Sequence, residues 1–335
     1  MDKILTVVIP VYKVELYIRK CLESLIVADE LMRQLEVIVI NDGTPDNSAI
    51  IAKEYEEKYP DTFRVIDKAN GGHGSCCNKG LLLARGKYIH FLDSDDWFDE
   101  SFDVFLNYLK EETADVVLSK HVTENIKDKT RLLSPPSTRM VPFKQYDVTV
   151  YDRDLDVPSF NLWGSTFRTQ HLRDNGVKFV ERVSYDDSIL FLAPIPNLKS
   201  IVFYDLILYH YLVGREGQSM DRRVRVKKLN DMLQCNELLF SFYEQHKNDI
   251  PSKQLNKVCL YTLAFEVDQT LGNVWILPYK ESRNTFKEIL GKFSQYQIFK
   301  SLPPNFNYNI YISKPFFYGW IRYRVRLWYY CHARK

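Results

Sequence analysis

The sequence predicts an α/β protein with a mostly parallel, Rossmann-like sheet flanked by helices, followed by a helical region toward the carboxyl end. Through the first 119 residues, short apolar runs rich in Val and Ile alternate with segments whose apolar residues recur at helical spacing. Past residue 220 the pattern becomes helical. Because strands that alternate with helices pair in parallel through right-handed crossovers, the first part is expected to form one such sheet.

The expected elements follow from these patterns in chain order. Leu5–Val11 is a continuous β-branched run, which predicts a buried strand, and residues 15–26 carry apolar side chains at the spacing of an amphipathic helix. Asp46, Asn47 and Ser48 form a cap for a helix that runs to about Lys58. The other expected strands are 35–40, 63–66, 88–92 and 115–119, and the other helices are 75–85, 99–112, 188–193, 224–245, 253–271 and 279–293.

Residues 120–158 interrupt this regular pattern. Their periodicity is weak, and Pro135, Pro136 and Pro142 break any long helix or strand. We expect an irregular segment that covers the functional site.

The composition is that of a globular protein, with 45% apolar and 26% charged residues and a net charge of +2. The last residues, 314–335, differ: they contain six Lys and Arg residues, no acid and many aromatic rings. This basic aromatic tail suits a membrane interface, and the alternative is a terminal element that packs on the helical region. No recognised nucleic-acid-binding module accompanies it, so nucleic acid is not an expected partner.

Six cysteines without a Cys-x-x-Cys pair fit neither a zinc site nor a secreted disulfide framework. The short apolar run near the amino terminus is interrupted by Pro10, so no signal peptide is expected. No uncharged apolar stretch reaches about 18 residues, which predicts no membrane-spanning helix. Together with the tail, these observations predict a cytoplasmic protein, peripheral at the inner face of the cell membrane.

Three acids follow the expected strand 88–92. Asp93, Asp95 and Asp96 would lie at the carboxyl edge of the sheet, where open α/β sheets bind ligands. Carboxylates this close repel one another unless a cation or a proton offsets their charge. Hard oxygen ligands suit Mg²⁺ or Mn²⁺, so the acids predict a divalent metal that holds a nucleotide diphosphate. The alternative is a solvated acidic turn that caps the next helix.

Other polar residues follow the neighbouring expected strands. Pro10 and Tyr12 end the first strand and Glu15 opens the next helix, so Tyr12 could stack on a base and Glu15 could bind ribose. Asp42 ends the second strand and could accept from a base or a ribose; in isolation it is a plain turn residue. Residues 70–75 supply three glycines before a helix, which permits close approach of a phosphate, but their spacing matches no P-loop.

The order of these motifs resembles the inverting glycosyltransferases of family 2, which have the fold called GT-A and include enzymes that build bacterial cell-surface polysaccharides. The resemblance covers roughly the first 220 residues. Lys13 stands where the family often has Asn, and Cys77 stands where Arg is common. The matching stretches are Pro10-Val11-Tyr12-Lys13-Val14-Glu15, Asn41-Asp42-Gly43-Thr44-Pro45-Asp46, Asn70-Gly71-Gly72 with Cys76-Cys77-Asn78-Lys79-Gly80, and Asp93-Ser94-Asp95-Asp96.

The resemblance implies roles for particular residues. Asp187, in the pair Asp186-Asp187, would be the catalytic base that deprotonates an acceptor hydroxyl; without the resemblance this pair is a helix cap. Asp95 and Asp93 would hold Mn²⁺ or Mg²⁺, with His210 as a further ligand or as a packed core histidine. The residues implied to bind the nucleotide-sugar are Pro10, Tyr12, Glu15, Asp42, Asn70, Gly71, Gly72, Asn78, Asp93, Ser94 and Arg215.

The sequence therefore predicts a glycosyltransferase that moves a sugar from a nucleotide diphosphate, by resemblance UDP, to a saccharide or lipid-linked saccharide. The alternatives are a sugar nucleotidyltransferase, which would need a Gly-rich loop near the amino terminus, and a non-catalytic membrane-surface binding protein with the same fold. We expect four parts: a nucleotide-sugar-binding half (1–119), an acceptor-side half with the catalytic Asp (120–220), a helical domain (221–313) and the tail (314–335).

Overall fold

The structure is a computed structural model that describes residues 2–134, 140–150, 160–215, 218 and 222–303. The predicted tail, 314–335, lies outside the described residues, as does part of the irregular segment 120–158. Among the helices that are described, none is long and apolar enough to cross a membrane.

The amino-terminal half forms the predicted parallel sheet. Strands β1 (Leu5–Val11), β2 (Leu35–Asn41), β3 (Phe63–Asp67) and β4 (Tyr88–Phe91) pair in the order β3-β2-β1-β4. Every residue of β1 and β2 is buried, as expected for strands covered on both faces. The covering helices are α1 (Ile18–Glu23), α2 (Asp29–Met32), α3 (Ser48–Lys58), α4 (His73–Leu83) and α5 (Phe102–Glu111).

The strand order places a ligand site between β1 and β4. The chain moves from β1 to β2 and β3 on one side, then crosses back to β4 on the other side of β1. The connections after β1 and after β4 therefore diverge at the carboxyl edge of the sheet, and such a switch point leaves a crevice for a ligand. The acids that follow β4 lie at this edge.

The second half of the sheet is mixed rather than parallel. β9 (Ser165–Arg168) runs antiparallel to both β4 and β6 (Val116–Asn125), and β6 pairs in parallel with β10 (Ser200–Val213). The sequence pattern predicted β6 only as far as residue 119 and did not predict β10, whose burial alternates incompletely. The short strands β5 (Trp97–Phe98), β7 (Arg131–Ser134) and β8 (Gln145–Asp147) complete the sheet.

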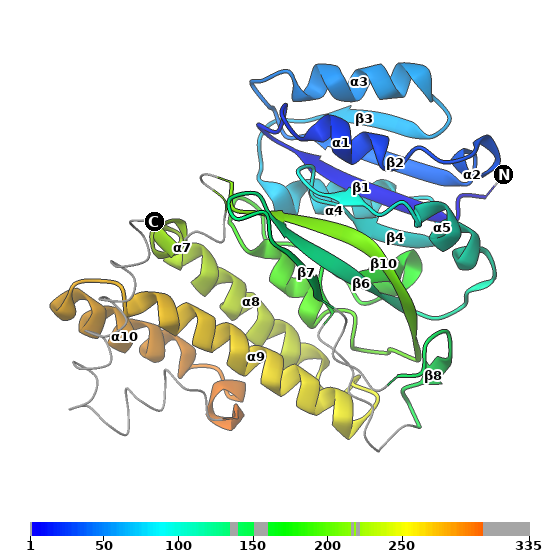
Figure 1. Cartoon of the computed structure of the whole chain (residues 1–335). Helices are drawn as coiled ribbons and strands as arrows, with labels where there is room; N and C mark the ends of the chain where they lie inside the picture. The colour runs from blue at the N-terminus through cyan, green and yellow to red at the C-terminus, as the bar shows by residue number, and fades with distance from the viewer. Residues whose placement is uncertain (1, 135–139, 151–159, 216–217, 219–221, 304–335) are drawn as a thin grey trace.

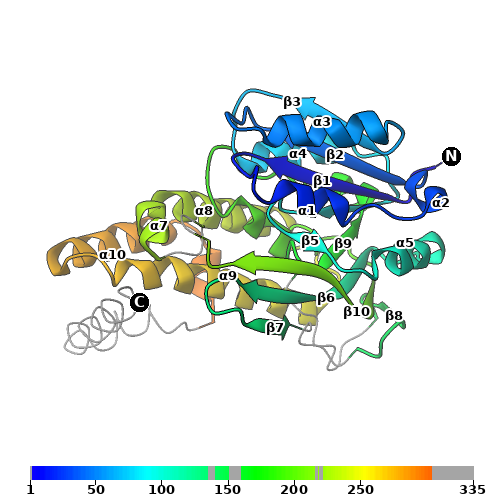
Figure 2. The same cartoon turned by 45° about the horizontal axis from the view of Figure 1, so that its top comes forward.

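The carboxyl-terminal helices pack beside the mixed half of the sheet (Figures 1 and 2). The helix predicted at 224–245 is two helices, α7 (Arg222–Lys227) and α8 (Leu229–His246), because the backbone of Lys228 leaves the helical region. Helix α9 (Lys253–Val274) begins at Ser252, whose side chain accepts a hydrogen bond from the Leu255 amide, and α10 (Tyr279–Phe293) follows. The remaining helical turns are α6 (Thr169–Asp174), η1 (Asp186–Phe191) and η2 (Ile298–Ser301).

Candidate active site

A cavity of about 1060 Å³ opens at the switch point of the sheet. One wall comes from the ends of β1, β2 and β4, and the opposite wall comes from η1 and helices α7, α8 and α9. The helical region therefore contributes to the site, although we placed a domain boundary at residue 220. Of the residues singled out from the sequence, those that line the cavity are Pro10, Tyr12, Asp42, Asn70, Gly72, Asp93, Ser94, Asp95, Asp187 and Arg215.

The acids after β4 divide into two roles. Asp93 and Asp95 line the cavity, whereas Asp96 points into the protein and is only 1% exposed. The Tyr209 hydroxyl and the Leu212 amide donate to Asp96 at 2.6 and 2.7 Å, so Asp96 ties β4 to β10. Burial, with the charges of Asp95 and Asp93, raises the pKa of Asp96 well above its usual value. Asp96 is thus a structural residue.

Asp95 meets a cation from the chain itself. The Nε of Arg215 donates to its carboxylate at 2.5 Å, and the guanidinium also lies over the Tyr17 ring, 5.5 Å from the centroid. Burial and the nearby Asp93 raise the pKa of Asp95 to about 6, while Arg215 acts in the opposite direction. Two carboxylates that destabilise each other's charge form a site suited to a further cation.

Asp42 holds the glycine-rich turn in place. Its two carboxylate oxygens accept hydrogen bonds from the amides of Gly71 and Gly72, both at 2.8 Å, and one of them also accepts from Lys68 at 2.5 Å. Gly72 has a φ of +84°, and a Cβ there would lie 3.1 Å from the Arg182 amide nitrogen, so the turn requires glycine. The turn leads into α4, which begins at His73 rather than at residue 75.

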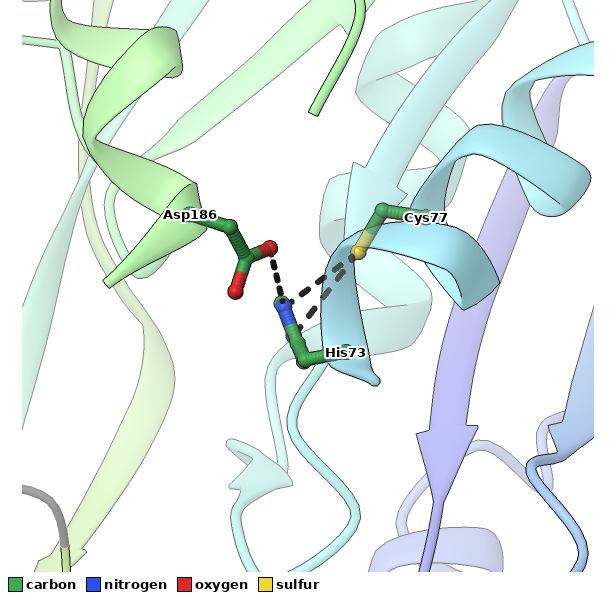
Figure 3. Close-up of side chains that lie close together, drawn as sticks. All are labelled: His73, Cys77 and Asp186. Atoms are coloured by element: carbon green, nitrogen blue, oxygen red, sulfur yellow. Dashed lines mark hydrogen bonds and ion pairs between the residues drawn. The ribbon is translucent and has the colours of Figure 1, made fainter. Parts of the chain in front are cut away.

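His73 connects the two walls of the cavity, and Figure 3 shows its contacts with Asp186 on η1 and Cys77 on α4. Its Nδ1 lies 2.8 Å from Asp186 on η1, and its Nε2 lies 3.2 Å from Asp93 after β4. Burial disfavours a charged imidazole, but Cys77, Asp186 and Asp93 hold the pKa of His73 well above its usual value. The imidazole therefore bridges two acids that the sequence separates by 93 residues.

Two groups of residues could hold a metal ion. In the described part of the chain, His73, Cys77 and Asp186 offer three donor atoms within 4.8 Å of one another. This mixed set suits a soft ion such as Zn²⁺, but both imidazole nitrogens already meet carboxylates. Asp93 and Asp95 offer only oxygen, which is the donor set that Mg²⁺ and Mn²⁺ prefer.

Asp187 lies across the cavity from the β4 acids. Two residues earlier, the backbone of Tyr185 has a φ of +68°, which turns the chain so that η1 begins at Asp186. Asp186 is buried against His73, while Asp187 is partly exposed and lines the cavity. Burial and the charge of Asp186 raise the pKa of Asp187 to about 7. A carboxylate with such a pKa can accept a proton from a hydroxyl near neutral pH.

Four of the predicted residues do not line the cavity. Glu15 accepts from the Asn47 amide at 3.1 Å, Asn78 ties α4 to Phe179, and Gly71 acts through its bond to Asp42. The ring of His210 has Asp99 and Glu124 at 2.9 and 2.8 Å from its two nitrogens and stacks on Trp97. The structure does not bring His210 to Asp95. His210 is instead a packed, hydrogen-bonded histidine, as the alternative interpretation of the sequence predicted.

Several cavity residues were not found from the sequence. His73 lies within the glycine-rich stretch 70–75, and its place there, at the sheet edge where the site was expected, could have identified it as a site residue. Arg182, Arg225 and Glu266 also line the cavity. Burial and the charge of Asp187 raise the pKa of Glu266 to about 7, and Arg225 opposes this shift. Nothing in the local pattern around Glu266 distinguishes it from other acids on helix surfaces.

The fold and this arrangement define a glycosyltransferase, and sequence comparison identifies the family. The family described as "Glycosyl transferase family 2" matches residues 6–175, and the chain belongs to it. The match covers the parallel sheet, the glycine-rich turn and the acids after β4.

Individual relatives match only part of the chain. A poly(ribitol-phosphate) beta-glucosyltransferase of Bacillus spizizenii is 30% identical over 223 residues, which is 64% of this chain and 33% of the relative. The putative glycosyltransferase EpsH of Bacillus subtilis is 41% identical over 120 residues, which is 36% of this chain and 34% of the relative. The matches therefore span about a third of the length of each of these relatives.

Solved structures show the same GT-A fold. The crystal structure of S. aureus TarS 1-349 in complex with UDP-GlcNAc aligns with a TM-score of 0.51 at 19% identity, covering 87% of this chain and 92% of that one. The mannosyltransferase PcManGT from Pyrobaculum calidifontis, in complex with GDP-Man and Mn²⁺, aligns with a TM-score of 0.50 at 13% identity, covering 90% and 83%. At these identities the likeness concerns the fold alone.

Proposed function

We propose that this glycosyltransferase transfers a sugar from a nucleotide diphosphate to a hydroxyl of a cell-surface polymer or lipid-linked saccharide, with inversion at the anomeric carbon. One observation carries the proposal: a single cavity has Asp93 and Asp95 on one wall and Asp187, with a pKa of about 7, on the other. A leaving diphosphate and an attacking hydroxyl must occupy opposite sides of the transferred sugar, and two separated acidic groups suit this geometry.

The donor would occupy the wall made by the parallel strands. Tyr12 is 45% exposed at the end of β1 and offers a ring face for a base. Asp42, Asn70 and Ser94 line the same wall and supply polar groups for a nucleoside and its phosphates. Because Asp42 already holds the glycine-rich turn, a nucleoside that contacts it would meet a preorganised group.

A divalent cation fits beside Asp93 and Asp95. The donor set is all oxygen, and burial together with the charge of Asp93 raises the pKa of Asp95, so a further cation would stabilise its carboxylate. When bound, Mg²⁺ or Mn²⁺ would supply positive charge to the departing diphosphate. Arg215 contacts the same carboxylate, so its guanidinium would be near the bound diphosphate and could bind its oxygens bidentately.

Asp187 would deprotonate the acceptor hydroxyl. Its position across the cavity from the β4 acids implies attack from the face opposite the leaving group, which inverts the configuration without a covalent intermediate. His73 holds the neighbouring Asp186 and so fixes the start of η1, from which Asp187 projects. In this role His73 is a positioning residue.

The relatives favour the choice of substrates. One of them is named a poly(ribitol-phosphate) beta-glucosyltransferase, and the structural neighbours are in complex with UDP-GlcNAc or with GDP-Man and Mn²⁺. We select UDP as the carrier and a teichoic acid or related polymer as the acceptor class. The basic aromatic tail would keep such an enzyme at the membrane where these polymers are assembled.

The test follows nucleotide-sugar binding and donor hydrolysis with Mn²⁺ or with EDTA. We expect a UDP-sugar to raise the melting temperature in Mn²⁺, and slow hydrolysis of the donor that EDTA stops. Asp187→Asn should keep donor binding and lose roughly 10²–10⁴-fold in turnover. Asp29→Asn, an exposed acid on α2, serves as the control and should match the wild type. Near-normal turnover by Asp187→Asn would exclude the base role.

A further inference from the structure

One part of the cavity lies away from the wall proposed for the donor. Beyond Asp187, its wall is formed by α9 residues Phe265, Glu266 and Gln269, together with Tyr185. A donor held at the carboxyl edge of β1 and β4 lies on the other wall. The acceptor, which must reach Asp187 from the side opposite the donor, is therefore expected to lie against α9.

Phe265 is exposed although it borders the cavity. Its side chain is 58% exposed, and Tyr261, one helical turn earlier, is 65% exposed. Residues at this four-residue spacing lie on the same face of a helix, so the two exposed rings form an aromatic strip that leads toward the cavity, which Phe265 borders. Exposed apolar surface that adjoins a cleft often marks a ligand site. Ring faces of this kind pack well against the C–H faces of sugars and polyols.

Polar groups lie beside this strip. The Arg225 guanidinium donates to the Gln269 side-chain oxygen at 3.1 Å and stands 5.8 Å from the centroid of the Tyr185 ring. Glu266 faces the same space, close enough to Asp187 and Arg225 for each to influence its pKa. Carboxylate, amide and guanidinium groups have planar donor and acceptor arrangements that match neighbouring hydroxyls.

We propose that Tyr261, Phe265, Glu266 and Gln269 form an acceptor subsite, named the α9 subsite, for a polyhydroxylated chain. The aromatic strip binds the sugar or polyol units behind the reacting one, and Glu266 and Gln269 orient the reacting unit so that its hydroxyl meets Asp187. This inference rests on the proposed function, because it assumes that Asp187 is the base. It makes the helical region part of acceptor recognition rather than a separate support.

Isothermal titration of the UDP-loaded, full-length protein tests the α9 subsite. The probes are chitotriose and a synthetic ribitol phosphate trimer, which present the shared hydroxyl chemistry as a sugar or as a polyol. We expect at least one probe to bind, and Phe265→Ala and Glu266→Gln each to weaken it about tenfold. Affinity for UDP, measured separately, should not change. Leu132→Ala and Glu281→Gln, exposed residues on β7 and α10, are the matched controls.

The outcomes separate the two proposals. If neither probe binds, or if binding is equal in Phe265→Ala, Glu266→Gln and the controls, the α9 subsite is wrong while UDP binding and donor hydrolysis still support the proposed function. If the wild type fails to bind any UDP-sugar, the proposed function itself is wrong. Circular dichroism melts of each variant show whether a weaker signal reflects unfolding.

Discussion

The Arg215 guanidinium contacts Asp95, a proposed metal ligand, with 2.5 Å between Nε and the carboxylate. Under the proposed function, Arg215 and a divalent ion would compete for this carboxylate in the absence of donor. A bound diphosphate would then offer oxygens to both cations.

Replacing Arg215 should separate these two effects. We expect Arg215→Ala to bind Mn²⁺ about tenfold more tightly without nucleotide, because the competing charge is gone. The same variant should bind UDP more weakly in Mn²⁺, because the diphosphate loses a bidentate donor. Titration calorimetry measures both affinities, and Arg33→Ala, an exposed arginine next to α2, is the control. Weaker Mn²⁺ binding by Arg215→Ala would contradict the competition.

Activity should fall as the pH drops through about 7. The base must be ionised to accept a proton, and burial together with Asp186 raises the pKa of Asp187 to about 7. A profile of kcat/KM against pH should therefore have an acidic limb near that value. Asp186→Asn removes the neighbouring charge and should shift this limb to lower pH. A limb that stays unchanged in this variant would show that another group controls it.

The same shift predicts that Asp187 destabilises the folded enzyme above neutral pH. Its pKa is higher in the folded than in the unfolded chain, so the folded state binds more protons between about 4 and 7. The folded state is not penalised by Asp187 below the unfolded pKa. The free energy of unfolding then falls as the pH rises to about 7, because the folded chain must give up a proton that it holds more tightly than the unfolded chain does. Asp187→Asn should therefore raise the melting temperature by a few degrees at pH 8 but not at pH 4. Equal melting curves for both proteins at pH 8 would argue against the shift.

The sequence predicted the elements whose patterns are local. Strands β1 to β4 and helices α3, α9 and α10 lie within a few residues of their expected positions, because burial on both faces or on one helical face leaves a periodic record. β10 was not predicted, because its long pairing with β6 depends on residues about 85 positions away. Local pattern cannot report such partners.

The site residues also divide into those that local patterns indicate and those that depend on distant parts of the chain. Acids at strand ends could be placed at the cavity from the strand pattern, and Asp93 and Asp95 do line it. Asp187, which only the family resemblance implied, lines it as well. His210 was suggested as a metal ligand by the family resemblance, but Asp99 and Glu124, from separate elements, contact its two ring nitrogens. Glu266 reaches the cavity through the packing of α9 against α7 and α8, which no short-range spacing encodes.

His73 should matter for both stability and catalysis. In His73→Ala, Asp93 and the buried Asp186 lose their shared partner, which we expect to cost about 1–3 kcal/mol of stability. Turnover should fall because η1, which carries Asp187, is no longer tied to α4. Denaturant melts and donor hydrolysis measure the two effects. Cys77→Ala, which removes a thiol beside the same ring, is the comparison, and an equal loss in both variants would deny His73 its bridging role.

The basic aromatic tail gives the last prediction. Residues 314–335 contain six basic groups and no acid, and each basic residue near an anionic lipid surface contributes about 1 kcal/mol to binding. A protein that ends at Ser313 should therefore stay in the supernatant when sedimented with vesicles of phosphatidylglycerol and phosphatidylcholine, while the full chain pellets. Vesicles of phosphatidylcholine alone are the control, because they lack the charge. Because the described residues that line the cavity all precede residue 270, the shortened protein should bind UDP as the full chain does. Equal sedimentation of the two proteins would mean that the tail does not supply the membrane contact.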